Sequence, residues 1–332
     1  MRGVVFSQGG EPAEVARVGN LLPAPEPRAA EVRVSISLAP VHRGDLVGIE
    51  AAPDLPFAPR RLGSEGMGVV TAVGTSVTSV QVGDRVAVFP APGAWSEQVT
   101  VPANAAVVVP ASVSDEVAAV TLVNAITSND VVRAVEDVRA AAGAAGDTPL
   151  IVTAAASAVG RLIVRQALDK GIPVIAVVRS DRSATTVRTF FPDVPLVVTG
   201  LDGWQTKLRT LVGARGVPAI TDAHGGSHVR DLLQFLADAG TLIVWGDLAA
   251  RQWTLSTSDL LMRELRVRAV SISRWMTRPD EVRAADQQAA VRVAEQRPEL
   301  FPVHAQYSLS ELRTALEAVR TNGSGTVLLR TN

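Results

Sequence analysis

The segment from residue 148 to residue 182, TPLIVTAAASAVGRLIVRQALDKGIPVIAVVRSDR, constrains the fold more than any other part of the chain. A short apolar run (150–153) leads through small residues into a helical pattern that ends at Gly171. A second run, rich in β-branched residues (174–178), follows and ends in a basic loop at 179–182. The segment therefore predicts a strand–helix–strand unit of the length that a mononucleotide-binding half requires.

The residues after this unit continue the alternation of strand and helix patterns. Apolar runs rich in β-branched residues are separated by segments whose apolar positions recur with a helical period. Such alternation predicts an α/β fold with a doubly wound parallel sheet. The expected strands are 194–198, 218–222, 241–245 and 266–273, and the expected helices are 115–123, 125–142, 204–212 and 229–238.

Residues 1–110 have a different pattern, in which short strands and turns predominate. Residues 60–89 combine β-branched side chains with several glycines, which indicates strands that bend sharply with their backbones in close approach. This pattern predicts a small β-barrel. The expected strands of this region are 3–7, 14–18 and 31–38, with a short helix after Pro40; a helix (279–295), a strand (303–308), a helix (310–320) and a strand (326–329) complete the chain.

Composition limits the classes of protein to which the chain can belong. It has 332 residues, 47% of them hydrophobic and 20% charged, which favours a globular protein with two domains. Its net charge is −1 without blocks of like charge, so there is no electrostatic basis for binding nucleic acid or an anionic membrane. Charges interrupt every apolar run before it reaches the roughly 20 residues of a membrane span. Met1 and Arg2 lead directly into a strand without a signal-peptide pattern, so we expect a cytoplasmic protein.

The chain contains no cysteine, which excludes disulfides, a thiol nucleophile and thiolate metal sites. Among its four histidines only His224 and His228 have the i,i+4 spacing of a helical ligand pair. Gly225 and Gly226 lie between them and disfavour a helix. We therefore expect no metal site.

The turn after the strand at 150–153 reads AAASAVG (154–160). Small residues let a backbone approach a pyrophosphate, and the helix N-terminus behind them supplies free N–H groups and partial positive charge. Two glycines of the dinucleotide-binding pattern G-x-G-x-x-G are replaced by Ala or Ser. By itself, this turn is compatible with a nucleotide site or with an ordinary alanine-rich connection.

The end of the next strand favours NADPH as the cofactor. An NAD site places Asp or Glu there to bind the ribose 2′-hydroxyl. This chain has Arg179, Ser180, Asp181 and Arg182 instead, and two guanidinium groups with a hydroxyl suit a 2′-phosphate. The alternative is a pair of solvent-exposed arginines in an arginine-rich chain. Asp181 either weakens the site or orients one of the arginines.

Motifs along nearly the whole chain resemble those of the zinc-independent medium-chain dehydrogenases/reductases, near the quinone oxidoreductases and the 2-enoyl thioester reductases. The barrel region contributes LGSEGMGVVTAVG (62–74), VGDRV (82–86) and GAWSEQV (93–99). The later motifs are AAASAVG (154–160), VVR (177–179), DAHGG (222–226), AGTLIVWG (239–246), SRW (273–275) and SGTVLL (324–329).

The resemblance implies a GroES-like catalytic domain from residues 1–118 and 298–332, and a Rossmann NADP(H)-binding domain from residues 119–297. It also implies a homodimer through the strand at 266–273. The resemblance also implies three groups of cofactor-binding residues. Those at the pyrophosphate are Ser157, Ala158, Val159 and Gly160, and those at the 2′-phosphate are Arg179, Ser180 and Arg182. Those along the rest of the cofactor are Gly225, Gly246, Ser271 and Ser273.

The chain departs from its apparent relatives where the substrate would bind. His42 stands where zinc-dependent members have a ligand cysteine and quinone reductases have Asn; it is either a contact for substrate or ribose, or a structural histidine. Enoyl reductases use a tyrosine as proton donor, but Pro53 occupies that position here. Asn124 and Thr127 match a polar turn near the nicotinamide, so they join His42 as candidate catalytic residues. Trp275 is a candidate wall of the substrate pocket.

The sequence therefore favours an NADPH-dependent reductase of a quinone or an α,β-unsaturated carbonyl, such as an enal, enone or enoyl thioester. The missing tyrosine leaves open a cofactor-binding protein with little catalytic activity. A dedicated biosynthetic reductase is a third possibility. The motifs do not separate a dedicated enzyme from a broad detoxifying one.

Overall fold

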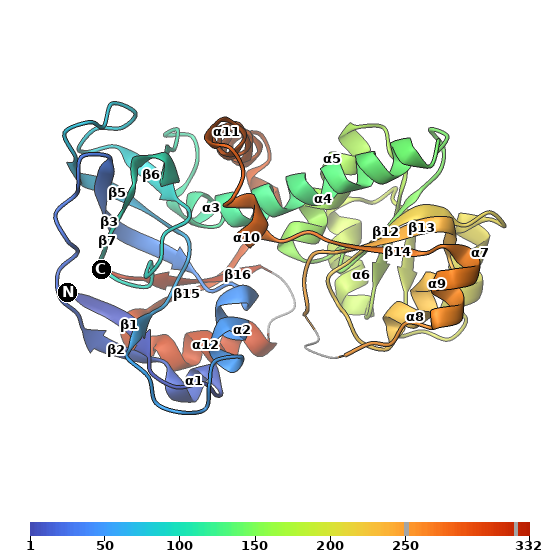
Figure 1. Cartoon of the computed structure of the whole chain (residues 1–332), viewed down its shortest axis with the longest axis horizontal. Helices are drawn as coiled ribbons and strands as arrows, with labels where there is room; N and C mark the ends of the chain where they lie inside the picture. Colours follow the sequence, from blue (N-terminus) through green and yellow to red (C-terminus); the bar gives the residue numbers. More distant parts are fainter. Residues whose placement is uncertain (249–251, 322–324) are drawn as a thin grey trace. The chain divides into compact units, whose positions relative to one another are not determined.

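The structure is a computed structural model that describes residues 1–248, 252–321 and 325–332. The chain forms two compact units, and both of its ends belong to the same one (Figure 1). Unit 1 comprises Met1–Val123 and Arg278–Asn332, and unit 2 comprises Asn124–Thr277. The motif at 324–329 begins with Ser324, which lies outside the described residues.

Helix α11 (Asp280–Gln296) belongs to unit 1, although it lies inside the predicted Rossmann range 119–297. The reason is a set of bonds to the barrel: the side-chain amide of Gln287 donates to the carbonyl oxygens of Phe89 (3.3 Å) and Asn104 (3.1 Å). The domain ranges given from the sequence, 1–118 with 298–332 and 119–297, stay a prediction.

Unit 1 is built around β3 (Glu31–Pro40), which pairs antiparallel with three strands. The sheet runs in the order β15-β16-β3-β5-β6-β8, with β7 also paired to β3, and a smaller sheet runs β2-β1-β4. The strands are β1 (Arg2–Phe6), β2 (Arg17–Asn20), β4 (Arg60–Arg61), β5 (Gly66–Val73), β6 (Arg85–Val88), β7 (Gln98–Pro102), β8 (Ala106–Val108), β15 (Val303–Ser308) and β16 (Thr326–Arg330). The helices are α1 (Pro12–Val15), α2 (Arg43–Glu50), α3 (Asp115–Ala119), α11 and α12 (Leu312–Thr321), with short 3₁₀ turns η1 (Ala103–Ala105), η2 (Pro298–Leu300) and η3 (Leu309–Glu311).

Strand β3 confirms the alternation read from the sequence, because Val32, Val34 and Ile36 are fully buried while the residues between them are partly exposed. The expected close approach of backbones is also present. A Cβ on Gly68 of β5 would lie 2.0 Å from the carbonyl oxygen of Ser35 on β3. The bare glycine therefore lets two strands pass closer than a side chain would permit.

One predicted strand of unit 1 is wrong. Residues 14–18 were expected to be a strand, but Pro12–Val15 form helix α1 and β2 begins only at Arg17. Pro12 stands at the first helical position, where its fixed φ suits a helix and its missing N–H costs nothing. This local effect outweighs the alternating pattern.

Unit 2 contains a parallel sheet in the order β11-β10-β9-β12-β13-β14. This is the strand order of a doubly wound dinucleotide-binding sheet, whose order reverses between β9 and β12. The strands are β9 (Leu150–Thr153), β10 (Val174–Val178), β11 (Leu196–Val198), β12 (Val217–Asp222), β13 (Leu236–Val244) and β14 (Arg266–Ala269). The helices are α5 (Ala158–Asp169), α6 (Asp181–Phe190), α7 (Trp204–Val212), α8 (His228–Leu233), α9 (Thr257–Arg263) and α10 (Ile272–Trp275), and α4 (Thr121–Ala141) leads into the unit.

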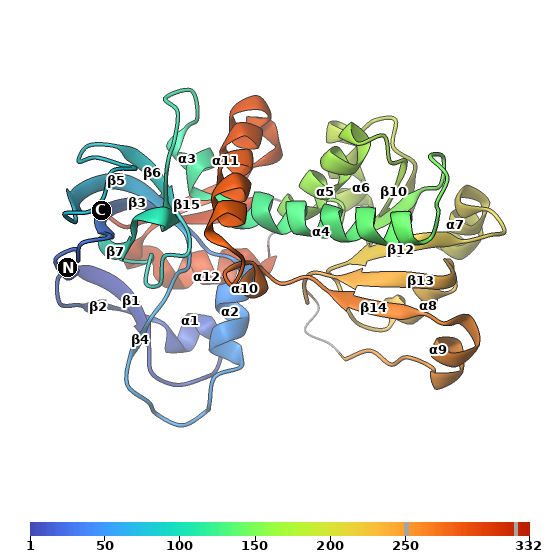
Figure 2. The same cartoon turned by 45° about the horizontal axis from the view of Figure 1, so that its top comes forward.

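Helices cover both faces of this sheet. Figure 2 shows α5 and α6 against one face and α8 and α9 against the other. The apolar side chains of α7 and α8 share one buried cluster with strands of the sheet, including Trp204, Leu232 and Phe235. Because both faces are covered, the strands are apolar on both sides, and all five residues of β10 are buried. No helix within the described ranges is long and apolar enough to cross a membrane.

The predicted strand–helix–strand unit is confirmed at β9, α5 and β10, whose strand bounds agree with the prediction. Three neighbouring predictions need correction. The helix expected at 229–238 ends at Leu233, because the chain from Leu236 onward pairs with β12 as strand β13. The strand expected at 266–273 ends at Ala269, since Ser271 caps the short helix α10. The basic loop after β10 contains the first turn of α6.

Candidate functional site

The carboxyl ends of β9 and β12 meet where the strand order of unit 2 reverses. In doubly wound sheets, ligands bind in the crevice beyond this point. The hydroxyl of Thr153, at the end of β9, donates to the Asp222 carboxylate at the end of β12 over 2.6 Å. Both side chains are almost fully buried. The bond joins the two strands at the base of the expected nucleotide site.

The turn between β9 and α5 has the geometry of a pyrophosphate loop. Ser157 caps α5, and its hydroxyl oxygen accepts the N–H of Gly160 over 3.0 Å. A Cβ on Gly160 would lie 2.2 Å from the carbonyl oxygen of Ala154, so only glycine lets the helix approach the strand this closely. The N–H groups of Ala158 and Val159 stand at the start of α5, where backbone donors have no partner within the helix. These four predicted residues therefore lie together as expected.

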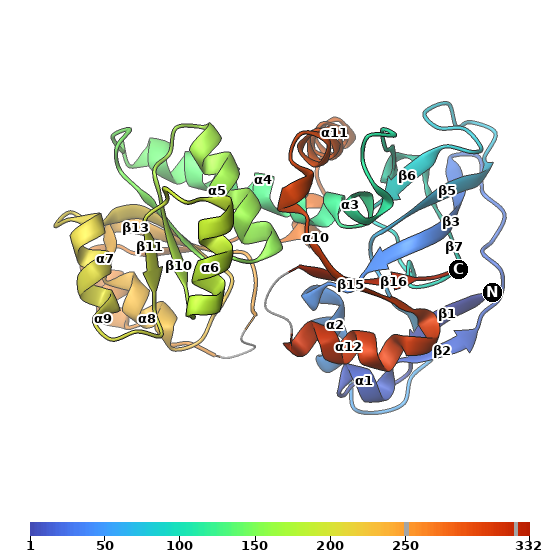
Figure 3. The ribbon, with the colours of Figure 1, turned by 180° about the vertical axis from the view of Figure 1, so that it is seen from behind.

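The basic residues follow β10 at the same edge of the sheet (Figure 3). Ser180 caps α6, and its hydroxyl oxygen accepts the N–H of Ser183 over 3.3 Å. Arg179 and Arg182 are exposed, and neither forms an ion pair with another residue of the described chain. Asp181 begins α6, where a carboxylate is favourable at the N-terminus, so it does not neutralise either arginine. The two guanidinium groups remain available to an anion.

The loop between β12 and α8 contributes a cluster around Asp222. One carboxylate oxygen accepts the N–H groups of His224 (3.1 Å) and Gly225 (2.8 Å). The other lies 3.4 Å from Nε2 of His228 and also accepts the Thr153 hydroxyl. Gly225 has a φ of +67°, which turns the chain back toward the sheet. The carboxylate is thus surrounded by donors, which hold its pKa below the usual value despite its burial.

Gly246 follows β13 at the same edge, where a Cβ would lie 3.1 Å from the Cβ of Ala223. Ser271 and Ser273 follow β14 and are exposed; the hydroxyl oxygen of Ser271 accepts the N–H of Ser273 over 3.3 Å. The parallel strands therefore bring these three predicted residues to the edge that also holds the turn at 154–160. Trp275 of α10 is fully buried, and its role as a pocket wall stays a prediction.

Unit 1 holds a separate polar cluster at the start of α2. Nε2 of His42 lies 2.6 Å from a carboxylate oxygen of Glu65, whose side chain is fully buried. The second oxygen of Glu65 accepts the backbone N–H of Val123 over 2.9 Å. Asp45 accepts the N–H of His42 (3.1 Å) and the hydroxyl of Ser64 (3.1 Å). Both carboxylates of this cluster are hydrogen-bonded through each of their oxygens.

These neighbours favour the charged form of His42. Burial works against the imidazolium, but the hydrogen bond to Glu65 and the charges of Glu65 and Asp45 outweigh it and raise the pKa of His42. Burial likewise raises the pKa of Asp45. His42 thus binds a proton more tightly than a free imidazole does, and 15% of its side chain is exposed to solvent.

The other candidates are placed as follows. Asn124 and Thr127 lie one helical turn apart on α4 at the start of unit 2, and both are buried. Trp95, in the motif at 93–99, is fully buried in unit 1, where its indole N–H donates to the carbonyl oxygen of Pro40 over 2.9 Å. The tryptophan is thus part of the barrel core.

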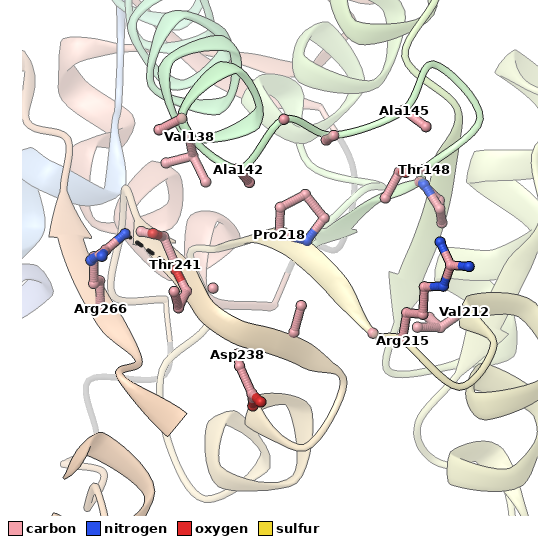
Figure 4. A pocket seen from close by; sticks show the side chains of 18 of the residues that line it. Val138, Ala142, Ala145, Thr148, Val212, Arg215, Pro218, Asp238, Thr241 and Arg266 are labelled. Atoms are coloured by element: carbon pink, nitrogen blue, oxygen red, sulfur yellow. Dashed lines mark hydrogen bonds between the residues drawn. The ribbon is translucent and has the colours of Figure 1, made fainter. Parts of the chain in front are cut away.

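A groove of about 1310 Å³ lies on unit 2, but at the opposite edge of the sheet (Figure 4). It is lined by the segment before β9 and by the first residues of β12 and β14, including Thr148, Pro218 and Arg266. Ligands of doubly wound sheets bind beyond the carboxyl ends of the strands. The groove is therefore distinct from the site at the 154–160 turn.

Known proteins share both the units and the motifs of this chain. Residues 28–111 match the family model described as the alcohol dehydrogenase GroES-like domain, and residues 158–289 match the one described as zinc-binding dehydrogenase. The quinone oxidoreductase of Pseudomonas aeruginosa is 28% identical over 345 residues, which cover 98% of each chain. The chain belongs to the medium-chain dehydrogenase/reductase family.

Two further relatives of this medium-chain dehydrogenase/reductase are informative. The mitochondrial enoyl-[acyl-carrier-protein] reductase of Rattus norvegicus is 29% identical over 291 residues, covering 85% of this chain and 75% of that protein. A mycobacterial protein solved in complex with NADPH superposes with a TM-score of 0.85 at 26% identity, over 99% of this chain and 100% of that one. The predicted GroES-like and Rossmann architecture is confirmed.

The name of the second family model refers to zinc, but the polar residues present do not fit a zinc site. The described residues contain no group of three His, Asp or Glu side chains arranged to hold a metal ion. At the position of the family's ligand cysteine, Nε2 of His42 is already bonded to Glu65, and the nearby Ser64 hydroxyl donates to Asp45.

Sequence reasoning missed the link between Thr153 and Asp222 and the contact between His224 and His228. The rings of these histidines lie 4.7 Å apart between centroids. Their i,i+4 spacing was the available signal, but that spacing was interpreted only as that of two metal ligands on a helix. Two glycines with positive φ form a turn that brings the rings together without a helix.

Proposed function

We propose that this chain is an NADPH-dependent reductase that transfers hydride to a quinone or an α,β-unsaturated carbonyl. The observation that carries the proposal is Arg179, which has no ion-pair partner in the described chain and lies one strand from the turn at 154–160. A Rossmann turn next to an unpaired arginine fits a nucleotide with a 2′-phosphate. The mycobacterial relative solved with NADPH supports the cofactor.

The residues that would hold the cofactor follow from this placement. The N–H groups at the start of α5, behind Ser157 and Gly160, suit the pyrophosphate. Arg179, Ser180 and Arg182 suit the 2′-phosphate. Gly225, Gly246, Ser271 and Ser273 lie along the same edge and would border the rest of the molecule. When bound, NADPH supplies a hydride from its nicotinamide ring.

The protein must still supply position, polarity and a proton. Asn124 and Thr127 are the candidates to polarise a substrate carbonyl, as predicted from their motif. His42, whose pKa is raised by its bond to Glu65, is the candidate proton donor in place of the tyrosine that Pro53 replaces. A quinone or an activated alkene also accepts a proton from water, so reduction does not depend on a single donor.

The proposal is tested by measuring NADPH and NADH binding to the wild type and to Arg179→Ala. Loss of one charge-assisted phosphate contact, worth about 2 kcal/mol, should weaken NADPH binding roughly 30-fold and leave NADH binding unchanged. Arg188→Ala is a matched control, because Arg188 is an exposed arginine farther along α6. Equal affinity of the wild type for both cofactors would contradict the cofactor assignment.

A cofactor-binding protein with little activity is the second candidate function, favoured by Pro53 at the tyrosine position. An NADPH-oxidation screen with quinones, enals, enones and enoyl thioesters separates the two functions. Turnover of any of these classes at an ordinary enzymatic rate excludes the inactive protein. The class that turns over fastest also distinguishes a quinone reductase from an enoyl reductase.

Assembly and location stay proposals. We propose a homodimer through β14, since this last strand of the sheet leaves all four of its residues exposed. Light scattering on the wild type and on Val267→Pro tests it, because proline would block pairing along that edge. A cytoplasmic location remains the expectation stated from the sequence.

A further inference from the structure

His224 and Arg179 leave the sheet of unit 2 at the same level, on either side of β9. Val177 pairs with Thr153, and the Thr153 hydroxyl bonds to Asp222, so these three residues form one row across the sheet. Arg179 and His224 each follow that row by two residues. Neighbouring strands lie about 4.8 Å apart, so the two backbones are roughly 10 Å apart at this level. An extended arginine side chain spans most of that distance.

Within the part of the chain that the structure describes, the ring of His224 is hydrogen-bonded to no carboxylate. Asp222, the buried carboxylate of the cluster, is occupied by the Thr153 hydroxyl, by two backbone N–H groups and by His228. No ring nitrogen of His224 forms a hydrogen bond with another described residue, and its ring contact is with His228 at 4.7 Å. His224 is 9% exposed, so its ring is largely removed from water but not sealed from a ligand.

The charged groups that act on His224 come from each neighbouring segment. Arg179 follows β10, His228 begins α8, and both disfavour a proton on the ring; Asp222 of β12 and Asp247 after β13 favour one. Burial is the largest effect, and together with Arg179 it lowers the pKa of His224 to about 4. In the free protein the ring is therefore neutral near pH 7. Of the two cations that oppose a proton on His224, Arg179 has the larger effect, and it forms no ion pair with a described residue.

A phosphate bound at Arg179 reverses this balance. The dianion neutralises the arginine and adds a negative charge within reach of the same ring. The charged form of His224, which the free protein disfavours, becomes the favourable one. A cofactor without the 2′-phosphate has no such effect.

Given the proposed binding of NADPH, we propose that His224 takes up a proton from solvent when the 2′-phosphate binds beside Arg179. His224 is thereby a second group, beyond the basic turn after β10, that distinguishes NADPH from NADH. By linkage, the contribution of His224 to the preference for the phosphorylated cofactor increases as the pH falls toward 6.

Titration calorimetry of the full chain with NADP⁺ and NAD⁺ tests the proposal without turnover. Runs at pH 6 and pH 8 in two buffers of different ionisation enthalpy count the protons taken up. The 2′-phosphate itself loses a proton when it meets Arg179, so the informative quantity is the difference between the wild type and His224→Gln. We expect the wild type to take up more protons at pH 6 with NADP⁺, and to gain about threefold in NADP⁺ affinity over the variant between pH 8 and pH 6.

Two histidines serve as controls. His304→Gln removes an exposed histidine of unit 1 and should behave as the wild type. His228→Gln keeps His224 and should retain extra proton uptake at pH 6. If His228→Gln loses the uptake and His224→Gln keeps it, the assignment to His224 is wrong.

Histidine NMR on the wild type avoids reliance on a folded variant. The pKa of His224 should rise from about 4 when NADP⁺ is added and stay there with NAD⁺. An unchanged pKa, together with identical proton counts for the wild type and His224→Gln, overturns the proposal while leaving NADPH binding intact. If NADP⁺ binds no tighter than NAD⁺ at any pH, the proposed cofactor assignment fails as well, so the two failures are distinguishable.

Discussion

His42 in unit 1 shares a 2.6 Å hydrogen bond with the Glu65 carboxylate, whereas the ring of His224 in unit 2 has no such bond within the described residues. Both side chains are largely buried. Glu65 and Asp45 favour a charge on His42, and burial together with Arg179 disfavours one on His224. The neighbours thus shift the pKa of the same type of side chain in opposite directions.

The comparison extends to other cations of the two units. In unit 1 the polar cluster at α2 is held by internal hydrogen bonds, which connect the start of α2 to Glu65, just before β5, and to Val123. In unit 2, Arg161 of α5 is fully buried, and its Nε and one terminal nitrogen have no hydrogen-bond partner in the described chain. Ion pairs within a unit stabilise it. An unpaired cation can be neutralised by a bound anionic ligand, and without one it lowers the stability of the fold.

The largest effect is expected when the hydrogen-bonded pair of His42 and Glu65 in unit 1 is broken. Glu65→Ala should destabilise the protein by about 3 kcal/mol, because it leaves the His42 ring and the Val123 N–H without their partner. Calorimetric unfolding measures the loss. Glu65→Gln, which keeps the shape and one acceptor, should cost less than half as much. A loss below about 1 kcal/mol for Glu65→Ala would show that the cluster is not tightly coupled to folding.

The next effect is smaller and of opposite sign. Arg161→Met should stabilise the protein by about 1 kcal/mol, because burial lowers the pKa of Arg161 to about 10 and, among the described residues, the charge has only the ring of Phe190 as a partner, 4.8 Å away. Arg165→Met is the control on the same helix, since Arg165 pairs with Asp169 at 2.6 Å. Urea denaturation of both variants measures the change. Destabilisation by Arg161→Met would mean that the cation–π contact outweighs burial.

The smallest effects appear in the pH dependence of stability. The raised pKa of His42 means that its contribution is fully present below its ordinary pKa of 6.5 and is lost as the pH rises through the higher folded value. The lowered pKa of His224 has the reverse consequence. The folded state binds its proton less well than the unfolded state, so stability is lost as the pH falls from 6.5 toward about 4.

Unfolding free energies between pH 4 and pH 8 test this contrast. His42→Gln should remove the decline at the alkaline end, and His224→Gln should flatten the decline at the acidic end. If both variants alter the same end of the pH profile, the pKa values of the two histidines are not shifted in opposite directions. His304→Gln, in an exposed position, should leave the profile unchanged.

Local and periodic signals explain what the sequence revealed of the fold. The strand–helix–strand unit at 150–178 could be read because apolar runs, a capping Ser157 and the helix end at Gly171 agree. The α1 turn was missed because a single proline at its start outweighed an alternating pattern. The sequence pattern places the start of β13 at residue 241 and not at Leu236, because the first residues of this strand pair with β12 only in the folded sheet.

The site was readable to the extent that its residues follow strand ends. Arg179 and the turn at 154–160 could be placed together because parallel strands bring their carboxyl ends to one edge. The Thr153–Asp222 bond and the His224–His228 contact depend on side-chain direction and on two positive-φ glycines. The pairing of His42 with Glu65 joins positions 23 residues apart, and no periodic pattern marks it.

The clearance at Gly160 has a genetic consequence. Every single-base change of a glycine codon that replaces the residue introduces a Cβ, and here that atom would lie 2.2 Å from the Ala154 carbonyl oxygen. No one-step path to another residue therefore preserves the contact between α5 and β9. In a library of random single-base mutants selected for function, position 160 should be among the most depleted, whatever substrate is used for the selection.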